Sequence, residues 1–250
     1  MVLVPDGIQG GIGMKKVLLY SGGMDSWLID KLWQPDVRLY IDIHGEYSEA
    51  EKARLPKDVQ IVDFPFLGQF EQEDKYIPMR NLYFLMIGTH YGDKVCLGAT
   101  AGDGGADKSY DFLSGAEGMI SRLWEDKKVQ KQKSIYKRFC LKTKGEMIDA
   151  YIEQGGTIDE IRQQTFSCYT PEDGNECMAC YPCFRKFAML YTRGAEYDED
   201  MKRKMWEYIK ANVIPTKEQG GYDGTYYTQR GEESKDLEKC VEMLREEFEK

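Results

Sequence analysis

The sequence has 250 residues, of which 42% are hydrophobic, and its formal net charge is −9 at pH 7. This length suffices for one sizeable domain with a small appendage, and the negative charge argues against a broad nucleic-acid-binding surface. The chain contains no run of about eighteen apolar residues, so we expect a cytoplasmic protein without a membrane span. Residues 1–13 lack the features of a secretory signal and are interpreted as a leader or tag-like segment.

Strands and helices are predicted to alternate along residues 15–98. Short apolar runs that suit buried parallel strands are followed by segments with helical spacing of their apolar residues. This order predicts an α/β fold with a doubly wound, mainly parallel sheet that binds ligands at the carboxyl ends of its strands. The predicted strands are 17–20, 37–43, 60–64 and 95–98, and the predicted helices are 26–33, 48–55 and 79–91.

A glycine loop, Ser-Gly-Gly-Met-Asp-Ser at residues 21–26, joins the first predicted strand to the first predicted helix. Glycines let backbone amides approach an anion, and the helix N-terminus adds partial positive charge. A phosphoryl-transfer loop would end in lysine, whereas a carboxylate here suits a divalent cation that bridges it to pyrophosphate. ATP with Mg²⁺ is therefore predicted to bind Ser21, Gly22, Gly23, Asp25 and Ser26, with Asp25 and Ser26 as catalytic residues. The alternative is a plain turn in which Asp25 or Ser26 caps the helix.

Beyond Gly98 the predicted elements are mainly helical. A glycine-rich link precedes helices at 110–125, 144–154, 184–191, 197–211 and 236–249, and Thr157 with Glu160 forms a capping box that opens another helix. The basic segment 127–138 is interpreted as a solvated helix face or loop, with polyphosphate contact as the alternative. We divide the chain into the leader (1–13), a nucleotide-binding α/β domain (14–108), a helical substrate and zinc-binding region (109–212), and a polar loop with a C-terminal helix (213–250).

Four of the seven cysteines crowd into residues 168–183 with the spacing C-x8-C-x2-C-x2-C. In a reducing compartment this crowding indicates a metal site rather than disulfides. Four thiolates form a closed tetrahedral set with no open position for water, which predicts structural zinc at Cys168, Cys177, Cys180 and Cys183. An iron–sulfur cluster and a redox Cys-x2-Cys pair are the alternatives.

The glycine loop resembles the pyrophosphate loop of the adenine-nucleotide α-hydrolase-like ATP pyrophosphatases, which activate carboxylates, ureido groups or tRNA bases as adenylates. With the cysteine spacing added, residues 15–190 resemble the 7-cyano-7-deazaguanine synthases of the queuosine pathway. Tyr76–Leu85 is similar to that family's Tyr-x-Pro-Gly-Arg-Asn segment, with Met79 in place of glycine. Leu141–Gly155 is similar to its Thr-Lys-x-Glu helix, and the flanks of the first and last cysteines also match.

The resemblance implies an ATP-dependent C–N ligase acting on 7-carboxy-7-deazaguanine. ATP and Mg²⁺ would adenylate the carboxylate, ammonia would displace AMP to give an amide, and a second ATP would activate the amide oxygen to give 7-cyano-7-deazaguanine. A carboxylate is a poor electrophile until its oxygen becomes a phosphate leaving group, and the loop would stabilise departing pyrophosphate. The expected partners are this small acid and ammonia, without direct nucleic-acid binding, and a homodimer is compatible with the sequence.

Two segments depart from the family pattern on the substrate side. Asp103 is followed by Gly-Gly-Ala-Asp-Lys rather than the family's Ser-Gly-Tyr-Pro-Asp-Cys-Arg arrangement, and His44–Tyr47 replaces its Tyr-Gly-Gln-Arg. A member with these changes could stop at 7-amido-7-deazaguanine or amidate another deazapurine carboxylate. Substrate contacts are predicted at Arg80, Asn81, Asp103, Asp107 and Lys144. Their structural alternatives are a surface arginine, a helix cap, loop residues and a solvent-facing lysine.

A zinc-knuckle module that binds nucleic acid or protein is the rival from another class. It requires a basic, aromatic surface beside the cysteines, for which the chain offers Tyr169, Tyr181, Phe184, Arg185 and Lys186. The negative net charge argues against it. A tRNA-modifying ATP pyrophosphatase would need an RNA-binding appendage, which the sequence does not show.

Overall fold

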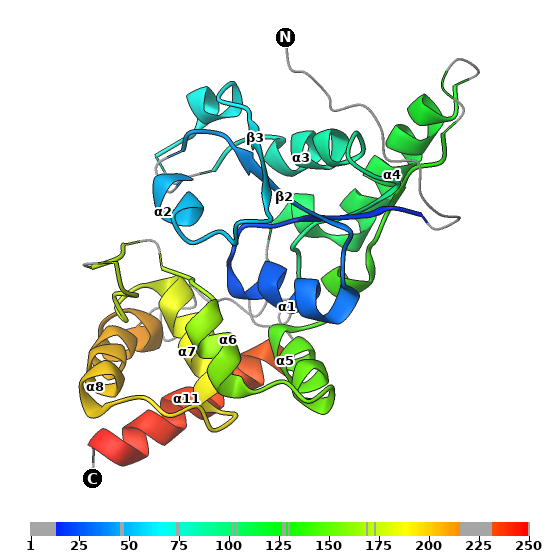
Figure 1. The fold of residues 1–250 in the computed structure, drawn as a ribbon. Coiled ribbons are helices and arrows are strands. Elements are labelled where there is room, and N and C mark those ends of the chain that lie inside the picture. The colour runs from blue at the N-terminus through cyan, green and yellow to red at the C-terminus, as the bar shows by residue number, and fades with distance from the viewer. Residues whose placement is uncertain are drawn as a thin grey trace.

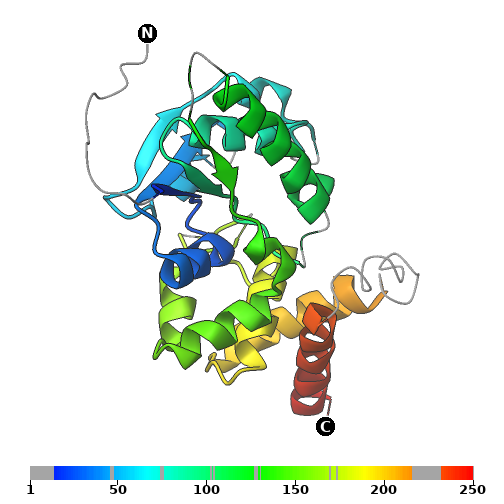
Figure 2. The ribbon, with the colours of Figure 1, turned by 90° about the vertical axis from the view of Figure 1, so that its right-hand side faces the viewer.

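A computed structural model describes residues 14–249 except 46–47, 74–75, 102, 104, 127–128, 130, 169, 173 and 216–231. The expected leader and most of the polar loop expected after residue 212 therefore lie outside the described residues. A parallel sheet with helices on both faces occupies one half of the molecule, and a group of helices occupies the other (Figure 1). In Figure 2 helix α1 (Met24–Trp33) lies at the boundary between the two halves.

Five strands form the sheet in the order β3-β2-β1-β4-β5, and every neighbouring pair is parallel. The chain order reverses between β1 and β4, where Val17 pairs with Val95. In open parallel sheets the ligand crevice lies at this switch point. The doubly wound α/β prediction is confirmed. The strands are β1 (Lys16–Leu19), β2 (Val37–Asp42), β3 (Gln60–Asp63), β4 (Lys94–Cys96) and β5 (Ser134–Ile135).

Adjacent residues of the central strands enter two different apolar cores. Val17 and Val95 pack with α3 (Arg80–Gly88) and α4 (Tyr110–Trp124) on one face of the sheet. Leu18 and Cys96 point to the other face, where α1 covers them. Burial on both faces explains why these strands read as continuous apolar runs in the sequence.

The second core continues from α1 into the helical half. It joins Trp27 of α1 to Phe184 and Phe187 of α7 and to Leu237 of the C-terminal helix α11, so one apolar core connects the two halves. The helices here are α5 (Lys144–Glu153), α6 (Ile158–Gln164), α7 (Tyr181–Tyr191), α8 (Glu199–Tyr208) with a π-helical continuation at Ile209–Val213, and α11 (Glu232–Phe248). The remaining short elements are α2 (Ser48–Lys52), η1 (Leu67–Phe70), η2 (Ala106–Lys108) and η3 (Arg138–Leu141).

The sheet layer extends further along the chain than the sequence indicated. Strand β5 lies inside segment 127–138, which was predicted as a solvated helix face or loop. Lys133 of that segment is buried, donates to the Gly92 carbonyl at 2.8 Å and pairs with Asp93 at 3.1 Å. Helix α4 packs on the sheet and β5 pairs with β4, although the sequence placed both in the helical region. Strand β5 was missed because a two-residue strand is too short to show a strand period.

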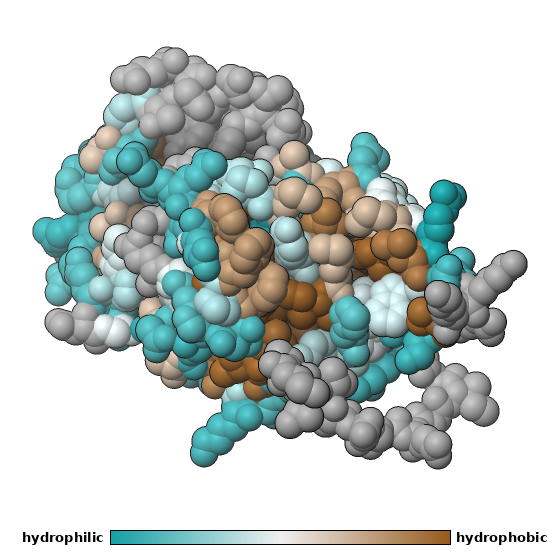
Figure 3. Space-filling view, turned by 90° about the horizontal axis from the view of Figure 1, so that it is seen from above, coloured by the Kyte–Doolittle hydropathy of each residue, from teal (hydrophilic) through white to brown (hydrophobic). Residues whose placement is uncertain are grey.

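Apolar side chains also gather on the surface. Figure 3 shows them in the middle of the face seen from above. Phe66 and Phe70, about half exposed, have ring centroids 5.2 Å apart, and Tyr83 of α3 packs beside Phe66. Among the described helices none is both long enough and apolar enough to cross a membrane.

Candidate active site

A cavity of about 530 Å³ opens at the carboxyl ends of β1, β2 and β4, between the two halves of the molecule. This volume is typical of sites for small molecules. The glycine loop forms one wall, and residues of α5 and α7 stand opposite. Of the predicted site residues, the lining contains Ser21, Gly22, Gly23, Asp25, Ser26, Arg80, Asp103, Asp107, Lys144 and Cys168.

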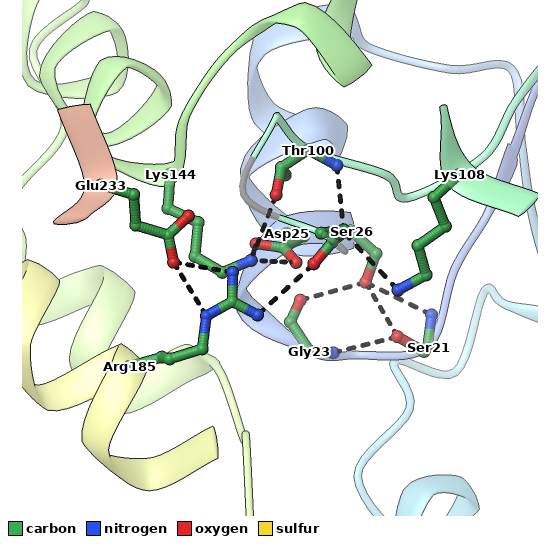
Figure 4. Close-up of polar contacts among 10 residues, drawn as sticks. Ser21, Gly23, Asp25, Ser26, Thr100, Lys108, Lys144, Arg185 and Glu233 are labelled. Carbon is green, nitrogen blue, oxygen red and sulfur yellow. Dashed lines mark hydrogen bonds and ion pairs between the residues drawn. The ribbon is translucent and has the colours of Figure 1, made fainter. Parts of the chain in front are cut away.

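The glycine loop has the backbone of an anion site. Gly22 has φ 76°, a left-handed conformation that glycine adopts without the steric cost of a side chain. Gly23 is the N-cap of α1, and no side chain caps this helix end. Ser26 instead donates its hydroxyl to the Gly23 carbonyl at 3.0 Å, and its Oγ lies 3.4 Å from that of Ser21 (Figure 4). The alternative in which Asp25 or Ser26 caps the helix is therefore wrong, and first-turn amides are left for a ligand.

Lys144 reaches Asp25 from a position 119 residues away in the chain. Its Nζ lies 2.5 Å from Asp25 Oδ1 and 3.4 Å from Thr100 Oγ1 (Figure 4), and the residue is only 5% exposed. A capping box fixes the start of α5 here, because Thr143 accepts from the Glu146 amide and Glu146 accepts from the Thr143 amide. The alternative of a solvent-facing lysine is wrong.

Asp103 lies in the loop after β4 and is buried among cations. It accepts from the Thr100 amide at 3.1 Å and lies 3.5 Å from Lys108 Nζ and 3.4 Å from Arg185 Nη1. Burial alone would raise the pKa of Asp103, but Lys144, Lys108 and Arg185 together hold it well below its usual range. The carboxylate is therefore ionised at neutral pH.

The other predicted substrate residues fall into two groups. Arg80, at the start of α3, and Asp107 line the cavity. Asn81 does not line it: its side chain is buried and donates to Asp107 Oδ2 at 2.8 Å. Asn81 can therefore act on a ligand only through Asp107. Met79 has φ 62°, a left-handed conformation that suits glycine better than a residue with a side chain.

Arg185 and Lys186 of α7 are site residues to which sequence reasoning gave no role in this cavity. Arg185 pairs with Asp103 and with Glu233 of α11, at 2.7 Å for the latter pair. Lys186 donates to the Arg162 and Thr165 carbonyls and to Glu176. The only signal was the Cys-Phe-Arg-Lys match at the last cysteine. Lys186 is almost completely buried and Arg185 is only 14% exposed, so they cannot form the exposed basic surface that the zinc-knuckle rival requires.

The four predicted zinc ligands converge. Their sulfur atoms all lie within 4.8 Å of one another, and tetrahedral zinc with bonds of about 2.3 Å needs separations of about 3.8 Å. The amides of Cys177 and Ala179 each donate to a cluster sulfur at 3.3 Å. Burial first, and neighbouring sulfur next, raise the pKa of Cys168 to about 11. A bound cation reverses that penalty by favouring thiolates, so the donor set fits zinc.

The cysteine segment touches the glycine loop. The Phe166 amide donates to the Gly22 carbonyl at 3.4 Å. Arg54, after α2, donates to the Gly174 carbonyl at 2.8 Å, and its guanidinium lies 3.6 Å from the centroid of the Phe166 ring. Arg54 and Phe166 both line the cavity. The wall beside the glycine loop is therefore built partly by the chain that leads to the four clustered cysteines.

Glu51 is a further lining residue that the sequence did not indicate. The Tyr40 hydroxyl donates to its Oε2 at 2.7 Å, and burial raises the pKa of Glu51. It stands on α2, on the side of the cavity that carries the altered segment after β2. Within that segment, residues 46–47 lie outside the described residues.

A family model described as queuosine biosynthesis protein QueC matches residues 36–192. The matched residues include the four clustered cysteines, Lys144, Asp103 and Arg185, whereas the glycine loop and α11 lie outside them. No curated protein sequence and no solved structure matched the chain.

Proposed function

Because the chain belongs to the QueC family of queuosine biosynthesis proteins, we propose that it is an ATP-dependent C–N ligase that converts 7-carboxy-7-deazaguanine with ammonia into 7-cyano-7-deazaguanine. The observation that carries this proposal is the setting of Asp25. Its carboxylate stands in a glycine loop at the end of β1, lines the cavity and pairs with a buried lysine. A loop whose role was only to cap α1 would not require an acid that faces the cavity and pairs with a buried lysine.

The glycine loop would hold the polyphosphate of ATP. The uncapped first turn of α1 offers amides to phosphate oxygens, and Ser21 and Ser26 place hydroxyls beside them. Asp25 would hold Mg²⁺ together with phosphate oxygens, and the metal would neutralise charge on the leaving pyrophosphate. Lys144 pairs with the Asp25 carboxylate and adds positive charge on the same side of the cavity.

The acid substrate would occupy the remainder of the cavity. Its carboxylate oxygen attacks the α-phosphorus of ATP as the bond to pyrophosphate breaks, which leaves an acyl adenylate. Ammonia then attacks the acyl carbon and AMP departs, giving the amide. In the second turn the amide oxygen takes the adenylyl group and leaves with it as AMP, while the nitrogen loses its protons to give the nitrile. We retain Arg80, Asp103 and Asp107 as proposed substrate contacts because all three line the cavity.

Zinc would have a structural role. Cys168, Cys177, Cys180 and Cys183 would hold it as a closed four-thiolate site, which fixes the chain that places Phe166 against the glycine loop. Protein ligands fill all four positions, so we propose no part for this metal in the reaction.

The direct test is product analysis by mass spectrometry. Purified protein is incubated with ATP, MgCl₂, ammonium and 7-carboxy-7-deazaguanine, beside Asp25→Asn and the control Asp111→Asn. Asp111 is an exposed acid in the first turn of α4, as Asp25 is in the first turn of α1. We expect the nitrile, AMP and pyrophosphate from the wild type and the control. Asp25→Asn should lower kcat/KM by at least about 100-fold, because it removes a charge that acts on the leaving group.

The outcomes separate the alternatives. Amide without nitrile would make the protein a one-step ligase, as the altered segment after Asp103 allows. Formation of no AMP or pyrophosphate with this acid would reject the proposed substrate. Equal activity of Asp25→Asn and the wild type would reject the proposed role of the loop.

A further inference from the structure

Helix α11 lies outside the residues matched by the family model, yet its Glu233 pairs with Arg185, which lines the cavity. Glu233, in its first turn, is 0% exposed. Arg185 Nε donates to Glu233 Oε1 at 2.8 Å, and Nη2 of the same guanidinium lies 2.7 Å from that oxygen (Figure 4). One edge of the Arg185 guanidinium is therefore held by a residue from the far end of the chain.

The other edge of Arg185 is directed at the site. Nη1 lies 3.4 Å from Asp103 Oδ1, and Arg185 lines the same cavity as the glycine loop. A guanidinium is planar and offers its donors in a fixed fork, so fixing one edge also fixes the direction of the other. In Figure 4 Arg185 and Glu233 stand on the opposite side of Asp25 from Ser21 and Gly23. In the proposed reaction pyrophosphate leaves toward the glycine loop. The carboxylate that attacks the α-phosphorus would then lie on the opposite side, which is the side of Arg185.

The position of Glu233 is firmly set by packing. Leu237, Cys240 and Leu244 of α11 are almost completely buried in the core of the helical half. Arg193 of the segment after α7 pairs with Asp236 of α11 at 2.9 Å and with Asp149 of α5 at 2.7 Å. The start of α11 is thereby tied to α5, the helix that carries Lys144.

Close packing confirms this connection. A Cβ atom on Gly145 would lie 2.4 Å from Arg193 Nη2 and 2.8 Å from Asp236 Oδ2, so a side chain at this point would displace the ends of these two paired side chains. The contact lies next to Lys144 in the chain. Helix α11 therefore supports two cationic residues of the cavity wall, one through this contact and one through Glu233.

We infer that Glu233 is a positioning residue, which holds the Arg185 guanidinium so that it binds the carboxylate of the acid substrate. This inference rests on the proposed function, because it assigns one wall of that site to the acid. A purely electrostatic effect of Glu233 would have the opposite sign. Removal of a negative charge near the cavity should strengthen binding of any anion, whereas loss of a positioning contact should weaken binding of the acid alone.

The test compares Glu233→Gln, Glu233→Asp, Arg185→Lys and the double variant Glu233→Gln/Arg185→Lys with the wild type. Glu242→Gln is the matched control, since Glu242 is an exposed acid on the same helix. KM for 7-carboxy-7-deazaguanine and kcat are measured by AMP release. The Kd of MgATP is measured by calorimetry, and the melting temperature of each variant is recorded.

We expect both Glu233 variants to raise KM for the acid about tenfold, which corresponds to the loss of one charge-assisted hydrogen bond. Glu233→Gln removes the negative charge, and Glu233→Asp keeps the charge but shortens the side chain. A similar rise in KM in both variants would indicate that Glu233 acts by positioning Arg185 rather than through its charge. The Kd of MgATP should change less than about twofold. The double variant should be no worse than Arg185→Lys, because Glu233 acts through Arg185.

Three results would overturn the inference. An unchanged or lower KM in Glu233→Gln would exclude a positioning role, and the lower value would favour electrostatics. A parallel loss of acid and MgATP affinity with a lower melting temperature would show a merely structural role. Wild-type protein that releases no AMP would overturn the proposed function and the identity of the ligand together, whereas wild-type turnover with insensitive Glu233 variants would overturn only the role of Glu233.

Discussion

The glycine loop and the cysteine cluster are both short motifs, but they are completed in different ways. All four sulfurs of the cysteine cluster come from residues 168–183, and a single cation is enough to join them. The glycine loop supplies one carboxylate and two hydroxyls, while its cationic partner comes from α5 and further polar groups come from the loop after β4 and from α7. The cysteine cluster is a local site, and the cavity at the glycine loop is a composite one.

This difference determines how each site should fail. A local site depends on its ligands and on the metal, so removal of either should abolish the site. A composite site depends on the relative placement of segments far apart in the chain. The contact of Phe166 with Gly22 connects the two sites, so damage to the cysteine cluster should reach the glycine loop, although the two motifs share no residue.

Loss of the metal should have the largest effect. The apparent binding free energy of structural zinc is about 10–16 kcal/mol, which is comparable with the whole stability of a typical domain. We expect Cys180→Ser, or chelation of the wild type, to remove the zinc, unfold the cysteine segment and weaken MgATP binding at least about tenfold. Metal analysis, circular dichroism and calorimetry would measure these changes.

Cys140→Ser is the matched control for this experiment. Cys140 is buried outside the cluster, and its thiol donates to the Lys137 carbonyl, a bond that serine can keep. It should retain one zinc per chain and wild-type affinity for MgATP. If Cys180→Ser loses zinc but binds MgATP normally, the two sites are independent and the proposed connection through Phe166 is wrong.

Removal of the buried Lys186 amine should have a smaller but still large effect. Its Nζ donates to the Arg162 and Thr165 carbonyls at 3.1 and 2.6 Å and to Glu176 at 3.0 Å, which ties α6 to the cysteine segment. Lys186→Met keeps most of the volume and leaves these acceptors without their donor. Urea unfolding should show a loss of about 3 kcal/mol, as for other broken buried pairs. Lys204→Met, at an exposed pair with Glu172, should change stability by less than about 0.5 kcal/mol.

Most of the fold could be predicted because its signals are local. The doubly wound parallel sheet followed from alternating strands and helices, and the capping box of Thr157 and Glu160 is confirmed at the start of α6. Strand β5 was not predicted, since two residues carry no period and its partner β4 lies about forty positions earlier in the chain. Local patterns thus identify elements well and identify their partners poorly.

The same reasoning explains the uneven result at the candidate site. The loop residues and the four cysteines could be singled out because each motif is contiguous or nearly so. Nothing near Lys144 in the sequence indicates its pairing with Asp25, and nothing near Glu233 indicates its pairing with Arg185. Such pairs depend on how α5, α7 and α11 pack, which is fixed by a core to which α1, α5, α6, α7, α8 and α11 all contribute.

The smallest predicted effect concerns the contact of Arg54 with Phe166, which lies between the two sites. The guanidinium of Arg54 lies over the Phe166 ring at 3.6 Å, and Arg54 also donates to Gly174 between the first two cysteines. A double-mutant cycle of Arg54→Met and Phe166→Leu should give a coupling free energy of about 0.5–1 kcal/mol in urea unfolding. The control pair is Arg203 and Phe248, whose separation of 5.9 Å should give less than about 0.3 kcal/mol. Coupling no larger than in this control would mean that the cysteine segment and the α/β half touch at Arg54 without stabilising each other, so that Phe166 and Gly22 alone would have to connect the sites.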